Sequence, residues 1–435
     1  MTLSGNPTES QMLSDQAISR PAKSNVRWTI CALLFFATSI NYMDRQVLSL
    51  LAPMLQHSIG WTEAQYGYII GAFQAAYAIG LVVAGRMVDK LGTRIGYAVI
   101  MGIWSLAAMS HALARSAFGF GIARFFLGLG ESGNFPAAIK TTAEWFPQSE
   151  RSLATGIFNS GANVGAVLAP AIIPWITLRF GWRAAFLTTG IFSLSWIIWW
   201  LTHYHKPTDH PKVSTPELEH IVSDPFQPTA QISWGKLFVR RQTWAFSLAK
   251  FLTDPFWWFY LFWLPKFFNA RFHLDLSHLG LPLIVVYNAS AVGSIGGGWL
   301  PALFHRKSGV AMTKARLTAM LLYAFAVVPI FFAGHTNSEW VAVALLSLAA
   351  AAHQAWSANL FTTASDMFPK SAVGGVVGIG GMAGSVGGFL LSITAGKILE
   401  ITHSYASLFA MAASAYLIAY FILNALAPGL KRVEV

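Results

Sequence analysis

Apolar residues along the chain gather into long runs that shorter polar segments separate. Each of twelve runs approaches or exceeds the roughly 20 residues that a helix needs to cross the hydrocarbon core of a bilayer. They cover residues 28–52, 65–85, 95–114, 118–141, 152–176, 183–202, 243–268, 277–302, 317–334, 339–364, 373–398 and 404–427. The pattern predicts an all-α integral membrane protein with 12 transmembrane helices.

One long polar segment divides these runs into two sets of six. With this division, the sequence predicts five parts: a disordered cytoplasmic tail (1–24), an N-terminal six-helix half (25–202), a cytoplasmic linker (203–242), a C-terminal six-helix half (243–427) and a cytoplasmic tail (428–435). The two halves also repeat, because FPQSERSLATGIFNSGANVG from Phe146 aligns with FPKSAVGGVVGIGGMAGSVG from Phe368 at a constant offset of 222. Two halves in parallel repeat are typical of transporters that bind substrate between them.

Composition supports the membrane class. Charged residues make up 11% of the chain, against about 25% in a soluble domain. The single cysteine, Cys31, excludes a disulfide framework and a multi-cysteine metal site. The net charge is +11, but the basic residues are scattered among short loops, so lipid rather than nucleic acid is the expected partner. We expect a monomer without cofactor or metal.

The positions of lysine and arginine predict the orientation. With the N-terminus inside, the inner segments hold 19 of the 29 basic residues and the outer segments hold six. This excess follows the positive-inside rule. Both termini and the linker are therefore expected in the cytoplasm, and the protein in the cell inner membrane.

Two acids and two arginines lie inside the first and fourth predicted spans, where an unpaired charge costs several kcal/mol. Asp44 and Arg45 belong to the first span, and Arg124 and Glu131 to the fourth. From a rise of about 1.5 Å per residue, the depths predict two pairs, Asp44 with Arg124 and Arg45 with Glu131. We interpret the acids as proton carriers and the arginines as receptors for a substrate carboxylate, which a guanidinium binds bidentately. The alternative is a static ion-pair network that joins two helices.

Other polar and aromatic side chains in the spans are candidates for lining the substrate site. Lys250 and Asp254 are spaced for an i,i+4 ion pair, the aromatic run that follows them suits a sugar ring, and the polar tenth span suits hydroxyl groups. Packing and hydrogen bonding between helices are the alternative roles. The candidates are Tyr42, Gln74, Tyr77, Asn163, Lys250, Asp254, Trp257, Trp258, Tyr260, His353, Gln354, Ser357 and Asn359.

Charged residues at the predicted cytoplasmic helix ends are candidates for a gate. The loop GRMVDKLGTR after the second span combines a small residue, an acid and several bases, which can latch helix ends together. This loop resembles the signature of the major facilitator superfamily. The predicted gate residues are Gly85, Asp89, Arg94, Glu144, Arg151 and Asp366.

More narrowly, the chain resembles the anion:cation symporter family within that superfamily, and within it the bacterial hexuronate transporters. The segments NYMDRQVLSLLAP, GYIIGAFQAAYAIG, ARFFLGLGESGNFPAAIKTTAEWFP and AHQAWSANLFTTASDMFPKSAVG carry the resemblance. It implies functional roles for Asp44, Arg45, Tyr77, Arg124 and Glu131. Sugar-acid relatives have a glutamine where this chain has Lys250, and galactonate-type relatives have an asparagine at Gly381 and a glutamine at Ala162. The extra cation at Lys250 fits a ring-form uronate or a diacid.

We therefore expect a proton-coupled symporter that imports a hexuronate such as glucuronate or galacturonate by alternating access. Aldonates or aldarates such as galactonate and glucarate are the second alternative, and aromatic or dicarboxylic acids are the third. A transporter-like sensor that signals without flux is the alternative from another class. An enzyme is not expected, because the sequence offers no nucleophile–base pair and no metal-ligand pattern.

Overall fold

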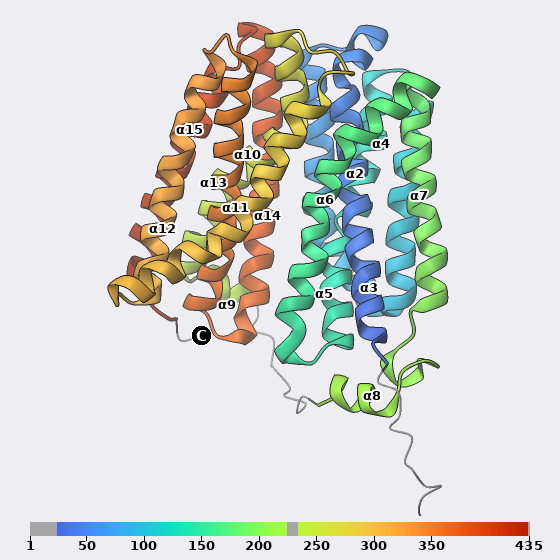
Figure 1. Ribbon diagram of the computed structural model, residues 1–435, viewed down its shortest axis with the longest axis vertical. Helices are drawn as coiled ribbons and strands as arrows, with labels where there is room; N and C mark the ends of the chain where they lie inside the picture. The colour runs from blue at the N-terminus through green and yellow to red at the C-terminus, as the bar shows by residue number, and fades with distance from the viewer. Residues whose placement is uncertain (1–23, 224–233, 434–435) are drawn as a thin grey trace, which may run out of the picture.

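The computed structural model describes residues 24–223 and 234–433, which are almost entirely helical (Figure 1). The N-terminal helices are α2 (Val26–Ile59), α3 (Glu63–Ser110), α4 (Ala117–Glu131), α5 (Asn134–Trp145), α6 (Gln148–Phe180) and α7 (Trp182–His203). The C-terminal helices are α10 (Arg241–Phe272), α11 (Gly280–Ser308), α12 (Met312–Val327), α13 (Glu339–Met367), α14 (Lys370–Thr402) and α15 (Ala406–Leu426). The short elements are η1 (His111–Leu113), η2 (Pro207–Asp209), α8 (Thr215–Ile221), α9 (Trp234–Phe238), η3 (Val328–Gly334) and η4 (Pro428–Leu430).

In the described parts of the chain, nine helical segments are long and apolar enough to cross a membrane. One of them contains α3, which bends sharply at Gly92, where φ is 76°, a value that glycine adopts readily. Trp61, before α3, and His111, after it, both contact the ring of Phe120, at 5.2 and 5.9 Å. The chain therefore leaves one end of the bundle and returns to it within α3. The segment that contains α3 thus crosses twice, and α10 and the α4–α5 pair add two further crossings. The fold is therefore consistent with the twelve predicted spans.

Two helical halves lie side by side (Figure 1). Across their boundary α3 packs on α14, α2 on α10 and α6 on α11. A Cβ atom on Gly67 of α3 would lie 2.6 Å from the carbonyl oxygen of Ser392 and 3.1 Å from the Cα of Gly396, both on α14. Small residues let helix backbones approach in this way, as is usual between transmembrane helices. This close approach joins the two halves.

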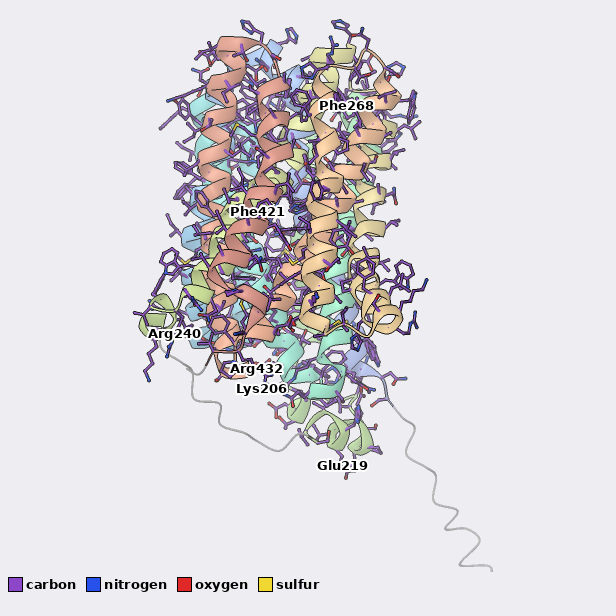
Figure 2. The ribbon with its side chains drawn as sticks, turned by 90° about the vertical axis from the view of Figure 1, so that its left-hand side faces the viewer. Lys206, Glu219, Arg240, Phe268, Phe421 and Arg432 are labelled. Atoms are coloured by element: carbon purple, nitrogen blue, oxygen red, sulfur yellow. The ribbon has the colours of Figure 1, made fainter. Side chains whose placement is uncertain are left out.

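The bundle has two distinct ends. Glu219 of α8 lies at one, which we call the linker end, and Phe268 of α10 lies at the other, the distal end (Figure 2). Near the distal end, Lys266 Nζ of α10 lies 2.6 Å from Glu63 Oε2 and 2.5 Å from Gln56 Oε1, both in the N-terminal half. The backbone N–H of Ala64 donates to Glu400 of α14 at 2.8 Å. Polar contacts thus hold the two halves together at the distal end.

At the linker end, the short helix α8 docks on the start of α2. Glu217 accepts hydrogen bonds from the backbone N–H groups of Val26 and Arg27, both at 3.1 Å, and from the hydroxyl of Ser24 at 2.5 Å. Asn25, at the N-cap of α2, makes no capping bond with its own side chain. Glu217 therefore supplies the N-terminal cap of α2 from a distant segment.

The domain limits given above stay a prediction. Of the predicted tail 1–24, only Ser24 belongs to the described residues, and part of the predicted linker (224–233) lies outside them as well.

Candidate functional site

An ion pair between α2 and α4 lies at the centre of the candidate site. Arg45 Nε lies 2.8 Å from Glu131 Oε2, and the two side chains are 1% and 0% exposed. Arg45 Nη2 also donates to Asn41 Oδ1 at 2.9 Å. The predicted pairing of Arg45 with Glu131 is thus confirmed. Because Glu131 ends α4, where the helix dipole disfavours a negative charge, the arginine compensates both the dipole and the burial.

Glycines in α4 bring Glu131 into place. A Cβ atom on Gly128 would lie 2.4 Å from the carbonyl oxygen of Phe73 in α3. One on Gly130 would lie 2.7 Å from Trp104, also in α3. The segment Gly-Leu-Gly-Glu therefore lets the backbone of α4 lie directly on α3, and the chain then breaks at Ser132 and Gly133 before α5 begins.

Aromatic rings surround the Arg45 guanidinium. Its carbon lies 4.6 Å from the ring centroid of Tyr42, 5.1 Å from Tyr77 and 5.2 Å from Phe73, all in the N-terminal half. The ring of Trp258, on α10 of the C-terminal half, lies 4.8 Å away. Ring faces attract a cation, most strongly where water is excluded. Arg45 therefore sits at the boundary between the halves and contacts both.

The predicted ion pair between Asp44 and Arg124 is wrong. Asp44 Oδ2 instead accepts hydrogen bonds from the Ser193 hydroxyl at 2.7 Å and from the Trp104 indole at 3.2 Å. Depth along a helix predicts the level at which a charge lies, but not its direction around the helix axis. The hydrogen bonds of Asp44 thus go to α3 and α7, and Arg124 of α4 acts on it only through a longer-range electrostatic interaction.

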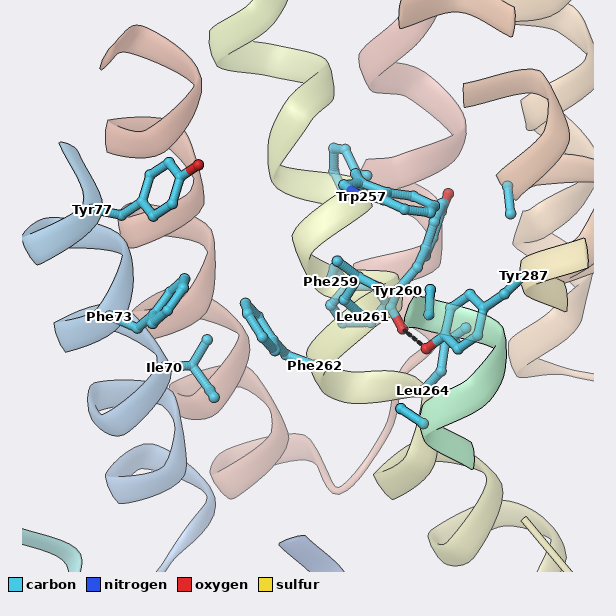
Figure 3. Close-up of a cluster of buried hydrophobic side chains, with 14 of the residues drawn as sticks. Ile70, Phe73, Tyr77, Trp257, Phe259, Tyr260, Leu261, Phe262, Leu264 and Tyr287 are labelled. Atoms are coloured by element: carbon cyan, nitrogen blue, oxygen red, sulfur yellow. Dashed lines mark hydrogen bonds between the residues drawn. The ribbon is translucent and has the colours of Figure 1, made fainter. Parts of the chain in front are cut away.

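Arg124 turns toward α2 and α10 instead. Its Nη2 donates to the backbone carbonyl of Arg45 at 2.6 Å. Its guanidinium carbon lies 5.1 Å from the ring of Phe73 and 5.3 Å from that of Phe262. Figure 3 shows Phe73 of α3 and Phe262 of α10 projecting toward each other across the boundary. Both buried arginines therefore lie where the halves meet.

Several buried polar atoms of this cluster have no hydrogen-bond partner among the described residues. They belong to both acids and both arginines, and each costs about 1–3 kcal/mol when it is left unpaired. A bound carboxylate or an added proton would satisfy them. The atoms are Asp44 Oδ1, Arg45 Nη1, Arg124 Nε and Nη1, and Glu131 Oε1.

Gln74 is fully buried where α3 meets α14, and neither atom of its amide has a partner among the described residues. A Cβ atom on Gly388 of α14 would lie 3.1 Å from its Cδ. Gln74 and Tyr77 were both predicted to line the site, but the structure places them in different surroundings. Tyr77 contacts Arg45, whereas Gln74 lies in the packed contact between the halves.

The C-terminal half contributes a second ion pair. Lys250 Nζ and Asp254 Oδ2 of α10 lie 2.7 Å apart, which confirms the predicted i,i+4 pair. The lysine side chain is 5% exposed and the aspartate side chain 19%. Gly384 of α14 makes room for the pair, because a Cβ atom there would lie 2.5 Å from Asp254 Oδ2.

Trp257 is held by a buried histidine. Its ring stacks on that of His353 at 5.4 Å with an interplanar angle of 2°. His353 Nδ1 lies 2.6 Å from the hydroxyl of Tyr416 on α15. One ring nitrogen and one ring face of His353 thus position Trp257 and Tyr416, and its role in hydroxyl recognition stays a prediction.

Two other predicted site residues are used in packing. Asn359 donates to the carbonyls of Gly297 at 2.6 Å and Ala355 at 2.9 Å, and so joins α13 to α11. Tyr260 is 1% exposed among the aromatic side chains of the C-terminal half (Figure 3). A polar group on a transmembrane helix can serve helix contact as well as substrate, and sequence position does not separate the two roles.

The remaining predicted residues are half-buried. Gln354 and Ser357 lie on α13, one turn apart. Asn163 lies on α6 between Gly161 and Gly165, which pack against α2, so it projects from the opposite side of the helix. None of these placements assigns a role.

The predicted gate residues at the linker end bind near neighbours. Asp89 of α3 pairs with Lys140 of α5 at 2.7 Å. Glu144 accepts hydrogen bonds from Thr93 at 2.7 Å and from the hydroxyl of Tyr204. These contacts tie the helix ends of the N-terminal half to one another.

Other gate candidates behave similarly. Arg94 donates to the carbonyl of Leu201 on α7 at 2.6 Å, and Asp366 pairs with Arg316 in the C-terminal half. The contacts at this end therefore stabilise each half separately. Two gate candidates remain: Arg151 lies at the start of α6, and Gly85 lies on α3.

Three residues next to the charges were absent from the predicted site: Phe73, Trp104 and Ser193. Phe73 precedes Tyr77 by four residues, so helical spacing could have placed it on the same face. Trp258 was a candidate as part of the aromatic run, but nothing in the sequence predicted its contact with Arg45. Trp104 and Ser193 carried no sequence signal, because their contact with Asp44 depends on how α3 and α7 pack on α2.

The sequence profile of the Major Facilitator Superfamily matches residues 34–392. This chain belongs to the Major Facilitator Superfamily. It is accordingly a multi-pass membrane transporter and not an enzyme. Among the described residues there is no group of three or more His, Cys, Asp or Glu side chains that could hold a metal ion.

This chain is similar to several transporters over most of its length. It is 32% identical to the hexuronate transporter of Escherichia coli (strain K12), covering 89% of this chain and 91% of that protein. It is 34% identical to the galacturonate transporter of Dickeya chrysanthemi, covering 75% and 96%. It is 29% identical to a probable galactarate/D-glucarate transporter of Bacillus subtilis (strain 168), covering 91% and 90%. The resemblance stated from the sequence motifs is confirmed.

Solved structures support the fold. A bacterial homologue of the human lysosomal transporter Spinster, in an inward-facing and occupied conformation, superposes with a TM-score of 0.74 at 16% identity. The match covers 93% of this chain and 97% of that one.

Proposed function

We propose that this transporter imports a hexuronate, such as glucuronate or galacturonate, together with protons. The relatives named above support the substrate class. The observation that carries the proposal is the buried Arg45–Glu131 pair, in which Arg45 keeps one nitrogen without a hydrogen-bond partner. A guanidinium with one unpaired nitrogen at the boundary between two halves suits a carboxylate ligand.

Proton and substrate compete for the same arginine. While Glu131 is ionised, it neutralises Arg45 and weakens the attraction for another anion. A proton on Glu131 removes that competition, and the substrate carboxylate takes over the guanidinium. We propose Asp44, which directly precedes Arg45 in the chain, as the second proton acceptor. The site is electrically balanced when it is empty with Glu131 ionised and when it is loaded with Glu131 protonated, but not in the two mixed states. Proton movement and substrate movement are therefore linked.

Contact with both halves makes the site suitable for alternating access. Arg45 and Glu131 belong to the N-terminal half, whereas Trp258 belongs to the C-terminal half and packs on the same guanidinium. A ligand at Arg45 therefore responds to any separation of the halves. We infer that the distal end, held by Lys266 with Glu63 and Gln56, is the outer side, with both termini in the cytoplasm.

An aldarate such as galactarate or glucarate is the second candidate substrate. The specific observation in its favour is Lys250, a third basic residue near the boundary of the halves, where a second carboxylate could bind. The probable galactarate/D-glucarate transporter among the relatives adds support of the same kind.

Uptake into proteoliposomes tests the proposal. Purified protein is reconstituted, and labelled glucuronate uptake is followed with and without an inward proton gradient, with the membrane potential held at zero by potassium and valinomycin. We expect accumulation only with the gradient, and competition by unlabelled galacturonate. Accumulation that ignores the gradient would refute proton coupling, and the absence of any uptake or binding would refute the substrate class.

A further inference from the structure

The Lys250–Asp254 pair differs from the Arg45–Glu131 pair in one respect. Both members of the N-terminal pair are almost completely buried, whereas Asp254 has 19% of its side chain exposed beside a lysine that is only 5% exposed. The acid is therefore the member that meets solvent or substrate first, and the base is shielded behind it. The pair can open on the side of its acid.

The lysine has a second support that would remain if the acid moved away. Its Nζ lies 4.1 Å from the ring centroid of Phe361 on α13 and 6.0 Å from that of Phe246. Ring faces hold an ammonium in place, but they do not neutralise its charge. A lysine this deeply buried still needs an anion beside it, and a substrate carboxylate can be that anion.

The surroundings of the pair bring no competing charge. Tyr42 of α2, His353 of α13 and Tyr416 of α15 face it, and α14 presents Gly380 and Gly384. The tyrosines and glycines are uncharged, and His353 is engaged with Tyr416 through Nδ1. Within the described residues, the charge of Asp254 is thus balanced locally by Lys250.

Tyr42 relates the two ion pairs to each other. Its ring lies 4.6 Å from the Arg45 guanidinium, and it interacts electrostatically with Asp254 as well. Tyr42 therefore lies beside Arg45 of one half and near the acid of the Lys250–Asp254 pair of the other.

We propose that Lys250 and Asp254 form a second proton-coupling pair, which takes up a proton only when a second anionic group of the substrate replaces Asp254 on Lys250. This inference rests on the proposed function, since it assumes a first carboxylate at Arg45. In the exchange, Lys250 gives up its hydrogen bond to Asp254 and donates to the incoming carboxylate. Asp254, left without a cation, takes a proton from water in the open site, so the net charge of the pocket does not change.

The consequence is a proton stoichiometry that depends on the substrate. A monoacid such as glucuronate occupies Arg45 and leaves the second pair closed. A diacid with the same six-carbon skeleton, such as glucarate, engages both pairs and carries one more proton. The same protein thus drives diacids more strongly than monoacids.

Equilibrium accumulation tests this stoichiometry. Proteoliposomes with a gradient of one pH unit, and with the membrane potential held at zero, are loaded to steady state with labelled glucuronate or glucarate. One additional coupled proton raises the accumulation ratio about tenfold per pH unit. We therefore expect a glucarate ratio about tenfold above the glucuronate ratio in the wild-type protein.

Two variants and a control complete the test. In Asp254→Asn, and in the charge-neutral double variant Asp254→Asn/Lys250→Gln, the glucarate excess should disappear. Asp275→Asn, which changes an exposed loop aspartate of the same half, should keep it. The accumulation ratio reports stoichiometry and not affinity, so a purely structural effect of these substitutions would slow uptake without changing the ratio.

The outcomes separate this inference from the proposed function. Equal ratios for the two anions in the wild-type protein, or an excess that persists in the double variant, would overturn the second coupling pair. If glucuronate fails to accumulate, the proposed function fails. The glucarate ratio then still tests the second coupling pair, because that ratio must fall about tenfold in the double variant. If neither anion is carried, both proposals are overturned.

Discussion

Arg45 Nε donates a 2.8 Å hydrogen bond to Glu131 Oε2, and neither side chain is more than 1% exposed. Two opposite charges this deeply buried depend on each other, because removal of one leaves the other uncompensated. A neutral residue of the same shape at position 131 mimics the protonated acid. The pair thus provides a direct test of coupling.

We expect Glu131→Gln to retain substrate exchange and to lose the share of accumulation that one coupled proton drives. With the glutamine in place, Arg45 stays available to a carboxylate, but no proton is carried at this position. Counterflow of labelled glucuronate should continue, while the accumulation ratio in a gradient of one pH unit should drop by about tenfold. The exposed linker residue Glu219 supplies a matched control, Glu219→Gln. Full gradient-driven accumulation by Glu131→Gln would assign Glu131 a purely structural role.

Arg45→Lys should weaken substrate binding. An ammonium keeps the charge but loses the planar fork that binds a carboxylate through two hydrogen bonds. Hydrogen bonds to charged groups contribute about 1.5–3 kcal/mol, so the dissociation constant should rise about 10- to 100-fold. Isothermal titration calorimetry of the detergent-solubilised protein measures it, with the exposed Arg115→Lys as the control. A wild-type dissociation constant for Arg45→Lys would mean that the carboxylate binds elsewhere.

Gly128→Ala should destabilise the protein, and Gly121→Ala should not. Both glycines lie on α4, but a Cβ atom at position 128 would lie 2.4 Å from a backbone oxygen, whereas position 121 has nothing within 4 Å. Overpacking of this kind costs about 1–3 kcal/mol, while alanine at an open helical position gains about 0.5–1 kcal/mol. Thermal unfolding followed by tryptophan fluorescence compares the two. Equal melting temperatures would show that α4 does not need its close contact with α3.

Docking of α8 should fail at low pH. Burial raises the pKa of Glu217, but hydrogen bonds from Ser24, from the backbone N–H groups of Arg27 and Val26 and from the Arg27 side chain outweigh it, so the pKa lies below the ordinary 4.5. A lowered pKa in the docked state means that docking is fully stabilised above 4.5 and weakens as pH falls through the lower value.

A spin label on Glu219→Cys reports this docking, since the one native cysteine, Cys31, is buried. We expect an immobile label at neutral pH, which becomes mobile as the pH falls below about 4.5 and through the lower pKa of the docked Glu217. In Glu217→Gln the label should be more mobile throughout. A label whose mobility does not change with pH or with this substitution would contradict the role of Glu217 as the anchor.

The sequence alone predicted the helices and two of the buried ion pairs. The apolar runs predicted the helices because a bilayer demands about 20 apolar residues per crossing and satisfies no backbone polar group. Local spacing predicted the Lys250–Asp254 pair, since residues four apart share one face of a helix. Depth arithmetic predicted the Arg45–Glu131 pair, which spans two helices but lies at one level.

Direction around a helix was beyond that arithmetic. Asp44 and Arg124 lie at similar depths, yet Asp44 faces Trp104 and Ser193, and Arg124 faces a carbonyl of α2. Which face turns inward depends on the packing of several helices at once, and packing follows from the shapes of side chains far apart in sequence.

The sequence by itself determined the class of protein, the number and order of its helical runs and the identity of the charges inside them, because hydropathy and charge are properties of each residue in turn. Only the tertiary structure decided which charge meets which partner. It placed Trp258 of one half on Arg45 of the other, used His353 and Asn359 for packing, and joined the halves at the distal end through Lys266. These relations exist only between segments that folding brings together, and no single stretch of the chain contains them.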